Sequence, residues 1–219
     1  IILENNTFNE SYVSDVSKID SFKPSFSLAD RVRSFVKVQD GCNYHCSFCT
    51  IPMARGRSRS SSISEVISLL HDIYSKGFNE VVVSGINLGD FGRGTDKGCY
   101  DLLKKIGTAT EVPRIRISSI EPNLLTDKII DLLANSDRFM PHLHIPLQSG
   151  SNRILKLMKR RYTKEFYIKK IEFIKKMIPN ISIGVDVITG FPTETNEEFL
   201  ETYQLLEFLE VSYLHVFPF

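Results

Sequence analysis

Three cysteines lie in one short segment of the sequence, with the spacing C-x-x-x-C-x-x-C. They are Cys42, Cys46 and Cys49. Three thiolates placed this closely can ligate three irons of a cubane 4Fe–4S cluster, and the fourth iron then has no protein ligand. Clusters that only carry electrons usually have four cysteine ligands. The spacing therefore predicts these cysteines as ligands of a cluster whose open iron binds another molecule.

Two other interpretations of this cysteine segment remain open. His45 and the three cysteines could form a Cys₃His zinc site, since structural zinc takes four tetrahedral ligands. All four ligands would then crowd into eight residues, whereas small zinc modules usually pair two ligand clusters. A redox pair formed by Cys46 and Cys49 would leave Cys42 without a role. Phe48, next to the last cysteine, is predicted to shield a cluster from water or to belong to the core.

Strands and helices must alternate around this segment. Strands are predicted over residues 32–39, 80–84, 114–118, 142–147, 181–189 and 212–217. Helices are predicted over residues 62–76, 100–109, 124–135, 151–158, 164–177 and 195–209, and two of them begin with capping boxes, Ser62 with Glu65 and Thr195 with Glu198. Six strands separated by helices imply parallel βαβ units. The fold class is therefore α/β, and both an open twisted sheet and a partial barrel fit the pattern.

Polar or glycine-containing segments follow the strands at their carboxyl ends. In parallel α/β proteins ligands bind at this edge of the sheet, so we expect one composite site there. The residues predicted to bind a cofactor at this edge are Ser84, Gly85, Asn87, Ser118, Glu121 and Gln148. Asp186 lies inside an apolar strand, where a carboxylate should be paired or functional. His142 and His144 share one face of their strand, and we predict hydrogen-bonded core histidines rather than metal ligands.

Composition restricts the remaining classes of function. The 219 residues can bury one sizeable core. The net charge is +1, so no overall basic field indicates a nucleic acid partner. No apolar stretch reaches the roughly 18–20 residues of a membrane span, so no membrane partner is expected. The clustering of three of the four cysteines, with Cys99 apart, favours a reducing cytoplasm over a secreted disulfide framework.

Basic residues gather in two places near the predicted site. One cluster is Arg55, Arg57 and Arg59, and the other is Lys156, Lys159, Arg160 and Arg161. A solvated surface is the ordinary role of such clusters. Because both flank the carboxyl edge of the sheet, we also predict that they contact phosphate or carboxylate groups.

The cysteine segment before alternating strands and helices resembles the radical S-adenosylmethionine superfamily. In that superfamily three cysteines hold a 4Fe–4S cluster, and the amino and carboxylate groups of S-adenosylmethionine chelate the open iron. An electron from the cluster splits the sulfonium into methionine and a 5′-deoxyadenosyl radical. The resemblance therefore implies both cofactors, an external electron donor and a partial (βα)6 barrel with outer helices.

Further segments resemble the methylthiotransferase family of this superfamily. They are residues 38–43, 54–56, 116–122, 142–151, 190–195 and 214–218. Residues 118–121 (Ser-Ser-Ile-Glu) and 214–218 (Leu-His-Val-Phe-Pro) look most like the branch that adds a methylthio group to C2 of N6-threonylcarbamoyladenosine at position 37 of tRNA. The resemblance thus implies a tRNA-modifying transferase whose substrate is the anticodon loop. It also implies that members of the two basic clusters face RNA, namely Arg55, Arg57, Arg59, Lys159, Arg160 and Arg161. Sister branches acting on isopentenyladenosine or on a ribosomal protein stay open, as does a zinc-binding interaction domain.

The resemblance covers residues 31–219, which we expect to form the radical S-adenosylmethionine domain. Residues 1–30 are polar and irregular, and we expect a linker or the remnant of a preceding domain. Full-length members of the family carry an N-terminal domain with a second 4Fe–4S cluster and a C-terminal TRAM domain for RNA. We expect this chain alone not to complete the reaction, and we predict no catalytic residue beyond the cluster ligands.

Overall fold

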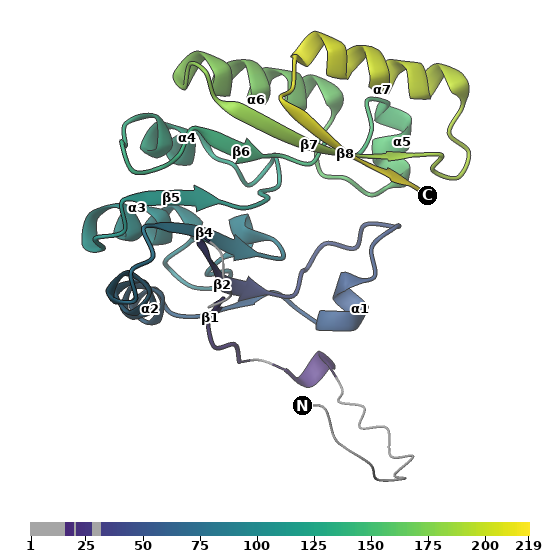
Figure 1. Cartoon of the computed structure of the whole chain (residues 1–219). Coiled ribbons are helices and arrows are strands. Elements are labelled where there is room, and N and C mark those ends of the chain that lie inside the picture. Colours follow the sequence, from purple (N-terminus) through teal and green to yellow (C-terminus); the bar gives the residue numbers. More distant parts are fainter. Residues whose placement is uncertain (1–15, 20, 28–31) are drawn as a thin grey trace, which may run out of the picture.

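Six parallel strands follow one another around a curved sheet in the computed structural model, which describes residues 16–19, 21–27 and 32–219 (Figure 1). They are β2 (Ser34–Asp40), β4 (Glu80–Gly85), β5 (Arg114–Ile117), β6 (His142–His144), β7 (Ser182–Thr189) and β8 (Tyr213–Pro218). Strands β2, β4 and β5 pair in parallel, as do β6, β7 and β8. The amide and carbonyl of Ile115 bond to Arg138 and Met140 and so connect the two groups. The predicted partial (βα)6 barrel is confirmed, and it is not closed, because β2 and β8 do not pair in the described chain.

Two short antiparallel strands extend the β2 edge. Strand β1 (Ser25–Phe26) pairs with the middle of β2, and β3 (Arg59–Ser60) pairs with its carboxyl end. The linker predicted over residues 1–30 therefore includes one strand of the sheet, and residues 1–15 lie outside the described residues. Strand β3 was not predicted from the sequence, since two residues carry no period-two pattern.

Helices cover the outer side of the sheet (Figure 1). The helices of the described chain are α1 (Ile51–Arg55), α2 (Ile63–Ser75), α3 (Cys99–Ala109), α4 (Asp127–Ala134), α5 (Asn152–Leu157), α6 (Lys164–Met177) and α7 (Asn196–Leu209), with 3-10 turns η1 (Val16–Lys18) and η2 (Leu88–Asp90). Helix α1 lies apart from the outer layer and contacts η1 (Figure 1). Helices α2, α3, α4, α6 and α7 contact one another in sequence order. Both predicted capping boxes are present, and they define the starts of α2 and α7. In the described part of the chain, no helix is long and apolar enough to cross a membrane.

Strand β6 is shorter than the six residues predicted for it. After His144 the amides of Leu147 and Gln148 both donate to the carbonyl of Asp186, at 3.1 and 2.8 Å. Two donors on one carbonyl break the regular ladder, as in a bulge. Gln148 takes a φ of 70°, which is unusual for a residue other than glycine. The bulge turns the chain across the carboxyl edge of the sheet, where the predicted site lies.

Glu198 joins α7 to α5 and provides a test of the packing on this side of the barrel. Its carboxylate accepts hydrogen bonds from Arg153 at 2.6 and 2.7 Å and from Ser151 at 3.0 Å. The hydrogen bonds from Arg153 are the main cause of a pKa lowered to about 2. Half of the Arg153 side chain is exposed, so solvent screens part of this interaction.

We expect Glu198→Gln to lower the free energy of unfolding by about 1–2 kcal/mol at neutral pH. Because the pKa is depressed in the folded state, the stabilisation is complete above the unfolded pKa of about 4.3 and is lost as the pH falls toward 2. Urea titrations should show the difference between the two proteins narrowing below about pH 4. The exposed neighbour Glu197 supplies the control, and Glu197→Gln should change stability much less.

Candidate functional site

The three cysteines of the predicted cluster line one cavity of about 220 Å³ at the carboxyl edge of the parallel strands. Residues from the ends of β4, β5, β6 and β7 complete its wall. The lining residues are Cys42, Tyr44, Cys46, Phe48, Cys49, Ile51, Ile86, Asn87, Ser119, Glu121, Pro146, Gln148, Arg160 and Asp186. The expectation that segments far apart in the sequence meet at one edge is therefore confirmed.

The cysteine segment is attached to the barrel at both ends. The Cys42 amide donates to the Gly56 carbonyl at 3.1 Å, and Ser47 bonds through its amide and hydroxyl to the last turn of α5, at 3.2 and 2.9 Å. Gly41 has a φ of 70°, and a Cβ there would lie 2.1 Å from the Arg57 carbonyl oxygen. Only glycine fits this close approach without moving the backbone. These contacts fix the direction in which the thiols face the cavity.

Burial controls the protonation of the thiols in the unliganded protein. It raises the pKa of both Cys42 and Cys46, although Arg160 opposes the effect at Cys46. The Arg160 guanidinium donates to the Cys46 sulfur at 3.3 Å. A metal binds the thiolate form, so binding here must release protons. Arg160 thus stabilises negative charge on one of the three sulfurs.

The distances between the sulfur atoms distinguish a 4Fe–4S cluster from a single zinc ion. In a tetrahedral zinc site the Zn–S distance of about 2.3 Å places the sulfurs about 3.8 Å apart. Among the residues described, no three ligand atoms within 4.8 Å of one another come from the cysteine segment. His45 is exposed and lines a neighbouring hollow, which shares only Cys42 with the thiol cavity. Three thiols that face one cavity but are too far apart for one ion fit a polynuclear cluster.

Three of the six predicted cofactor residues line this cavity, namely Asn87, Glu121 and Gln148. Asn87 is buried, and neither its side-chain oxygen nor its nitrogen has a hydrogen-bond partner. Leaving such a group unpaired is costly, so a polar ligand that bonds to it would be stabilised. Its backbone is fixed by the buried Gln39, whose Oε1 accepts from the Asn87 amide at 2.9 Å. Gln39 was not among the residues predicted for the site, since an amide in a strand has many ordinary roles.

The other three predicted cofactor residues do not line the cavity. The Ser84 hydroxyl donates to the Val36 carbonyl at 3.2 Å, within the sheet. Gly85 packs against Gln39, where a Cβ would lie 2.8 Å from Oε1. Ser118 has a buried hydroxyl without a partner, next to the lining residue Ser119. Ser84 and Gly85 therefore make contacts within the sheet, while the buried Ser118 hydroxyl has no hydrogen-bond partner.

The predicted RNA-facing residues divide into exposed and inward-facing side chains. Arg55, Arg57, Lys159 and Arg161 are exposed. The Arg160 side chain is only 3% exposed and pairs with Glu121 inside the cavity wall, so the prediction that it faces RNA is wrong. The Arg59 side chain is 12% exposed and pairs with Asp40 at 2.6 Å, so it too is turned from solvent. Both corrections have one cause, because each arginine neutralises a buried carboxylate.

Side chains from β6, β7 and β8 form a hydrogen-bonded group beside the cavity. His144 Nε2 is 2.9 Å and His215 Nδ1 is 3.0 Å from the same atom, Asp186 Oδ1. The Ser119 hydroxyl forms a hydrogen bond with the other ring nitrogen of His144. Asp186 and Ser119 line the cavity. The prediction was that Asp186 is paired or functional. It is confirmed in that the carboxylate is paired with His144 and His215.

The second histidine of β6 is also hydrogen-bonded. His142 Nε2 lies 2.9 Å from the hydroxyl of Tyr213 on β8. The Tyr213 ring is stacked with both His142 and His144, at centroid distances of 6.0 and 6.1 Å. This stacking holds the His142 and His144 rings in place.

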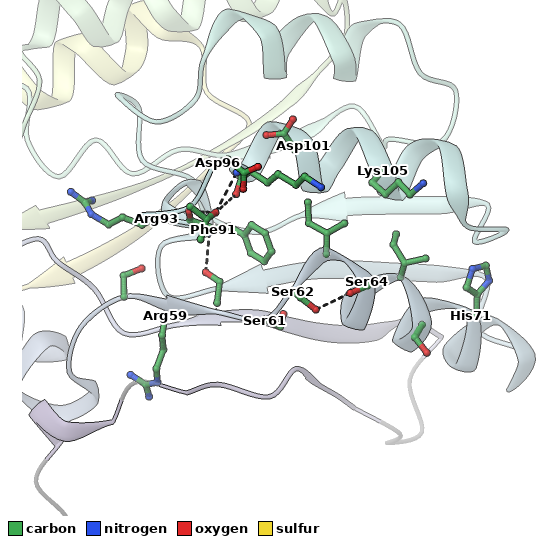
Figure 2. A pocket seen from close by; sticks show the side chains of 18 residues that line it. Arg59, Ser61, Ser62, Ser64, His71, Phe91, Arg93, Asp96, Asp101 and Lys105 are labelled. Carbon is green, nitrogen blue, oxygen red and sulfur yellow. Dashed lines mark hydrogen bonds between the residues drawn. The ribbon is translucent and has the colours of Figure 1, made fainter.

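A larger cavity of about 1120 Å³ lies elsewhere, between α2, α3 and the loop that precedes α3 (Figure 2). Figure 2 shows Arg59 and Arg93 at one end of it and His71 and Lys105 at the other. Its walls contain none of the cysteines and mix basic with acidic residues, including Asp96 and Asp101. Size alone does not identify a functional site, and the thiol cavity has the more specific chemistry.

Comparison with known proteins places this arrangement in context. Residues 36–206 match the family model described as the Radical SAM superfamily. The chain is 46% identical over 198 residues to the threonylcarbamoyladenosine tRNA methylthiotransferase MtaB of Bacillus subtilis, covering 90% of the chain and 44% of that protein. It is 38% identical to the tRNA-2-methylthio-N(6)-dimethylallyladenosine synthase of Syntrophomonas wolfei, covering 80% of the chain and 40% of that protein. The chain thus spans under half the length of both of these relatives.

Solved structures share the fold at lower identity. The radical S-adenosylmethionine methyltransferase TsrM from Kitasatospora setae superposes with a TM-score of 0.71 at 18% identity, covering 84% of the chain and 36% of that protein. Coproporphyrinogen III oxidase HemN from Escherichia coli superposes with a TM-score of 0.56 at 18% identity, covering 84% of the chain and 43% of that protein.

Proposed function

Because the chain belongs to the radical SAM superfamily, we propose that it is the radical domain of a tRNA methylthiotransferase. The substrate in this proposal is N6-threonylcarbamoyladenosine at position 37 of tRNA, and the product carries a methylthio group on C2 of the adenine. The observation that carries the proposal is the cavity in which three cysteine thiols meet unpaired polar side chains. The cytoplasm is the expected location, since the thiols must stay reduced.

Cys42, Cys46 and Cys49 would hold a 4Fe–4S cluster, and S-adenosylmethionine would bind beside it. Adenine C2 is an unactivated carbon, and these cofactors supply the strong one-electron chemistry that its substitution requires. Asn87 would donate and accept hydrogen bonds to the bound S-adenosylmethionine, because its amide is buried, unpaired and lines the same cavity. Gln148 would contribute a further amide at the end of β6.

The protein also controls access of water to the cavity. Phe48 packs against Ile154, Met158, Ile188 and Phe191, a small apolar cluster beside the thiols. Ile51 and Ile86 add apolar surface to the same wall. A dry wall protects reactive species from side reactions and is one means of tuning a cluster. Phe48 lines the cavity and packs on this apolar cluster, so this position fits both of its predicted roles, shielding and core packing.

Identity supports the threonylcarbamoyl branch over its dimethylallyl sister. MtaB proteins are 34–46% identical to the chain, and dimethylallyladenosine synthases are 35–38% identical. The support therefore comes from the MtaB proteins of Bacillus subtilis and Aquifex aeolicus, at 46% and 43%. The exposed residues Arg55, Arg57, Lys159 and Arg161 would contact phosphates of the anticodon loop, whose bases can be splayed out. A second 4Fe–4S cluster in a further domain and an external electron donor belong to this proposal.

Nucleoside analysis tests the substrate. The full-length gene product is reconstituted anaerobically, supplied with S-adenosylmethionine and reductant, and incubated with tRNA that carries N6-threonylcarbamoyladenosine. Mass spectrometry of digested tRNA should show the methylthio derivative of that nucleoside, and Asn87→Ala should raise the S-adenosylmethionine concentration needed by about tenfold or more. A methylthio group found only on N6-dimethylallyladenosine would assign the protein to the sister branch instead.

A further inference from the structure

The group formed by Ser119, His144, Asp186 and His215 has no role in the chemistry described so far. Burial opposes the charge of Asp186, but the hydrogen bonds and charges of His144 and His215 outweigh it and lower its pKa. The ionised carboxylate only accepts hydrogen bonds, so both ring nitrogens that face it must carry protons. The His144 and His215 rings are thereby held in defined orientations beside Asp186, which lines the cavity.

This arrangement determines which atom each histidine offers to a ligand. His144 gives its Nε2 proton to Asp186, and its Nδ1 faces the Ser119 hydroxyl, so both its nitrogens are occupied. His215 gives its Nδ1 proton to Asp186, and in the described part of the chain its hydrogen bonds involve only that nitrogen. Its Nε2 is therefore the atom that remains for a ligand.

His215 lies beside the thiol cavity and not in its lining, where a substituent that projects from the cavity can meet it. Its side chain is 53% exposed, while Asp186, to which it bonds, lines the cavity. The His215 ring packs against the rings of His144 and Tyr213, at centroid distances of 5.2 and 5.4 Å. Preorganised groups lose little freedom on binding, so such a contact keeps most of its energy.

The N6 substituent distinguishes the two tRNA substrates under comparison. The threonylcarbamoyl group carries a carboxylate and a hydroxyl, whereas the dimethylallyl group is purely apolar. The one arginine or lysine that lines the thiol cavity within the described chain is Arg160, and it already pairs with Glu121. A site for an anionic substituent needs another cationic donor, and a histidine held against a carboxylate can provide it.

We propose that His215 binds the carboxylate of the N6 substituent through Nε2, with Asp186 and His144 fixing the ring from behind. The inference rests on the proposed function and adds to it the residue that selects the substrate branch. In the bound state the His215 ring lies between two carboxylates, that of Asp186 and that of the substrate. His215 is thus a specificity-determining residue for an anionic nucleoside side chain.

Binding of two synthetic anticodon stem-loops tests this inference. One carries N6-threonylcarbamoyladenosine and the other N6-dimethylallyladenosine, and fluorescence anisotropy gives Kd for the reconstituted protein with S-adenosylmethionine. His215→Phe keeps a planar ring but removes both nitrogens, and His215→Lys restores a cation. His71→Phe is the matched control, since His71 is an exposed histidine on the outer helix α2.

The wild type should prefer the threonylcarbamoyl stem-loop, and His215→Phe should reduce that preference by about tenfold or more. Affinity of this variant for the dimethylallyl stem-loop should change by less than about twofold, because that substituent offers no acceptor. His215→Lys should regain part of the preference, and His71→Phe should keep all of it.

The outcomes separate this inference from the proposed function. If tRNA gains the methylthio group on N6-threonylcarbamoyladenosine while His215→Phe retains the full preference, the inference fails and the proposed function stands. If the wild type prefers the dimethylallyl stem-loop, both fail. Stoichiometric zinc or iron that persists when all three loop cysteines are serine and disappears in His215→Phe would also overturn it, because a metal would then occupy Nδ1.

Discussion

Cys46→Ala is expected to abolish reductive cleavage of S-adenosylmethionine, down to the level of a sample without protein. The three thiols line one cavity, and each would ligate a different iron, so no neighbouring side chain can replace the lost sulfur. Anaerobic assays with dithionite should detect no 5′-deoxyadenosine above background. Iron analysis of the same sample should show a large loss of bound iron.

Cys99→Ala is the matched control for this result. Cys99 is a buried thiol at the start of α3, and its burial raises its pKa to about 12, so it stays protonated. It does not line the thiol cavity. Cys99→Ala should keep both iron and cleavage, apart from a modest loss of packing energy. Undiminished cleavage by Cys46→Ala would disprove the assignment of Cys46 as a ligand.

Arg160→Met is expected to destabilise the protein by about 3 kcal/mol or more. The Arg160 side chain is 3% exposed, and its guanidinium pairs with Glu121, bonds to the Cys46 sulfur and lies 5.1 Å from the centre of the Tyr162 ring. Its removal leaves the Glu121 carboxylate, whose side chain is only 16% exposed, without this counter-charge. Urea unfolding of the metal-free protein measures the loss in free energy of unfolding.

A double variant separates the charge effect from lost packing. Glu121→Gln combined with Arg160→Met leaves no unpaired charge, so it should be less destabilised than Arg160→Met alone, by about 1 kcal/mol or more. Arg161→Met is the control, because Arg161 is exposed and covers the face of the Tyr44 ring at 3.8 Å. A loss below about 1 kcal/mol in Arg160→Met would show that the pair does not hold the cavity wall together.

Local patterns in the sequence were sufficient for most of the fold. Ser62 with Glu65 and Thr195 with Glu198 define helix starts through contacts three residues apart, and the structure contains both. Short runs rich in valine and isoleucine located β4 and β7 to within one residue at each end. The end of β6 was not predictable, because the bulge depends on Asp186, a residue about 40 positions away that accepts both Leu147 and Gln148.

The candidate site was predictable where chemistry lies in adjacent residues and not where it depends on packing. The cysteine spacing alone identified the thiols that share the cavity. The direction of Arg160 was predicted wrongly, since a basic run on a sequence looks the same whether its members face solvent or a buried Glu121. Asp186 was recognised as unusual, but its partner His215 was not, because 29 residues separate them and only the pairing of β7 with β8 joins them.

Spectroscopy of the anaerobically reconstituted protein tests the central claim most directly. The claim is that Cys42, Cys46 and Cys49 hold a 4Fe–4S cluster whose open iron binds S-adenosylmethionine. We predict a brown protein with stoichiometric iron and sulfide, whose reduced cluster gives an electron paramagnetic resonance signal that changes when S-adenosylmethionine is added. Isotope labels in the amino and carboxylate groups of S-adenosylmethionine should couple to that signal. A colourless protein that retains stoichiometric zinc, or a cluster signal unaffected by S-adenosylmethionine, would contradict the account.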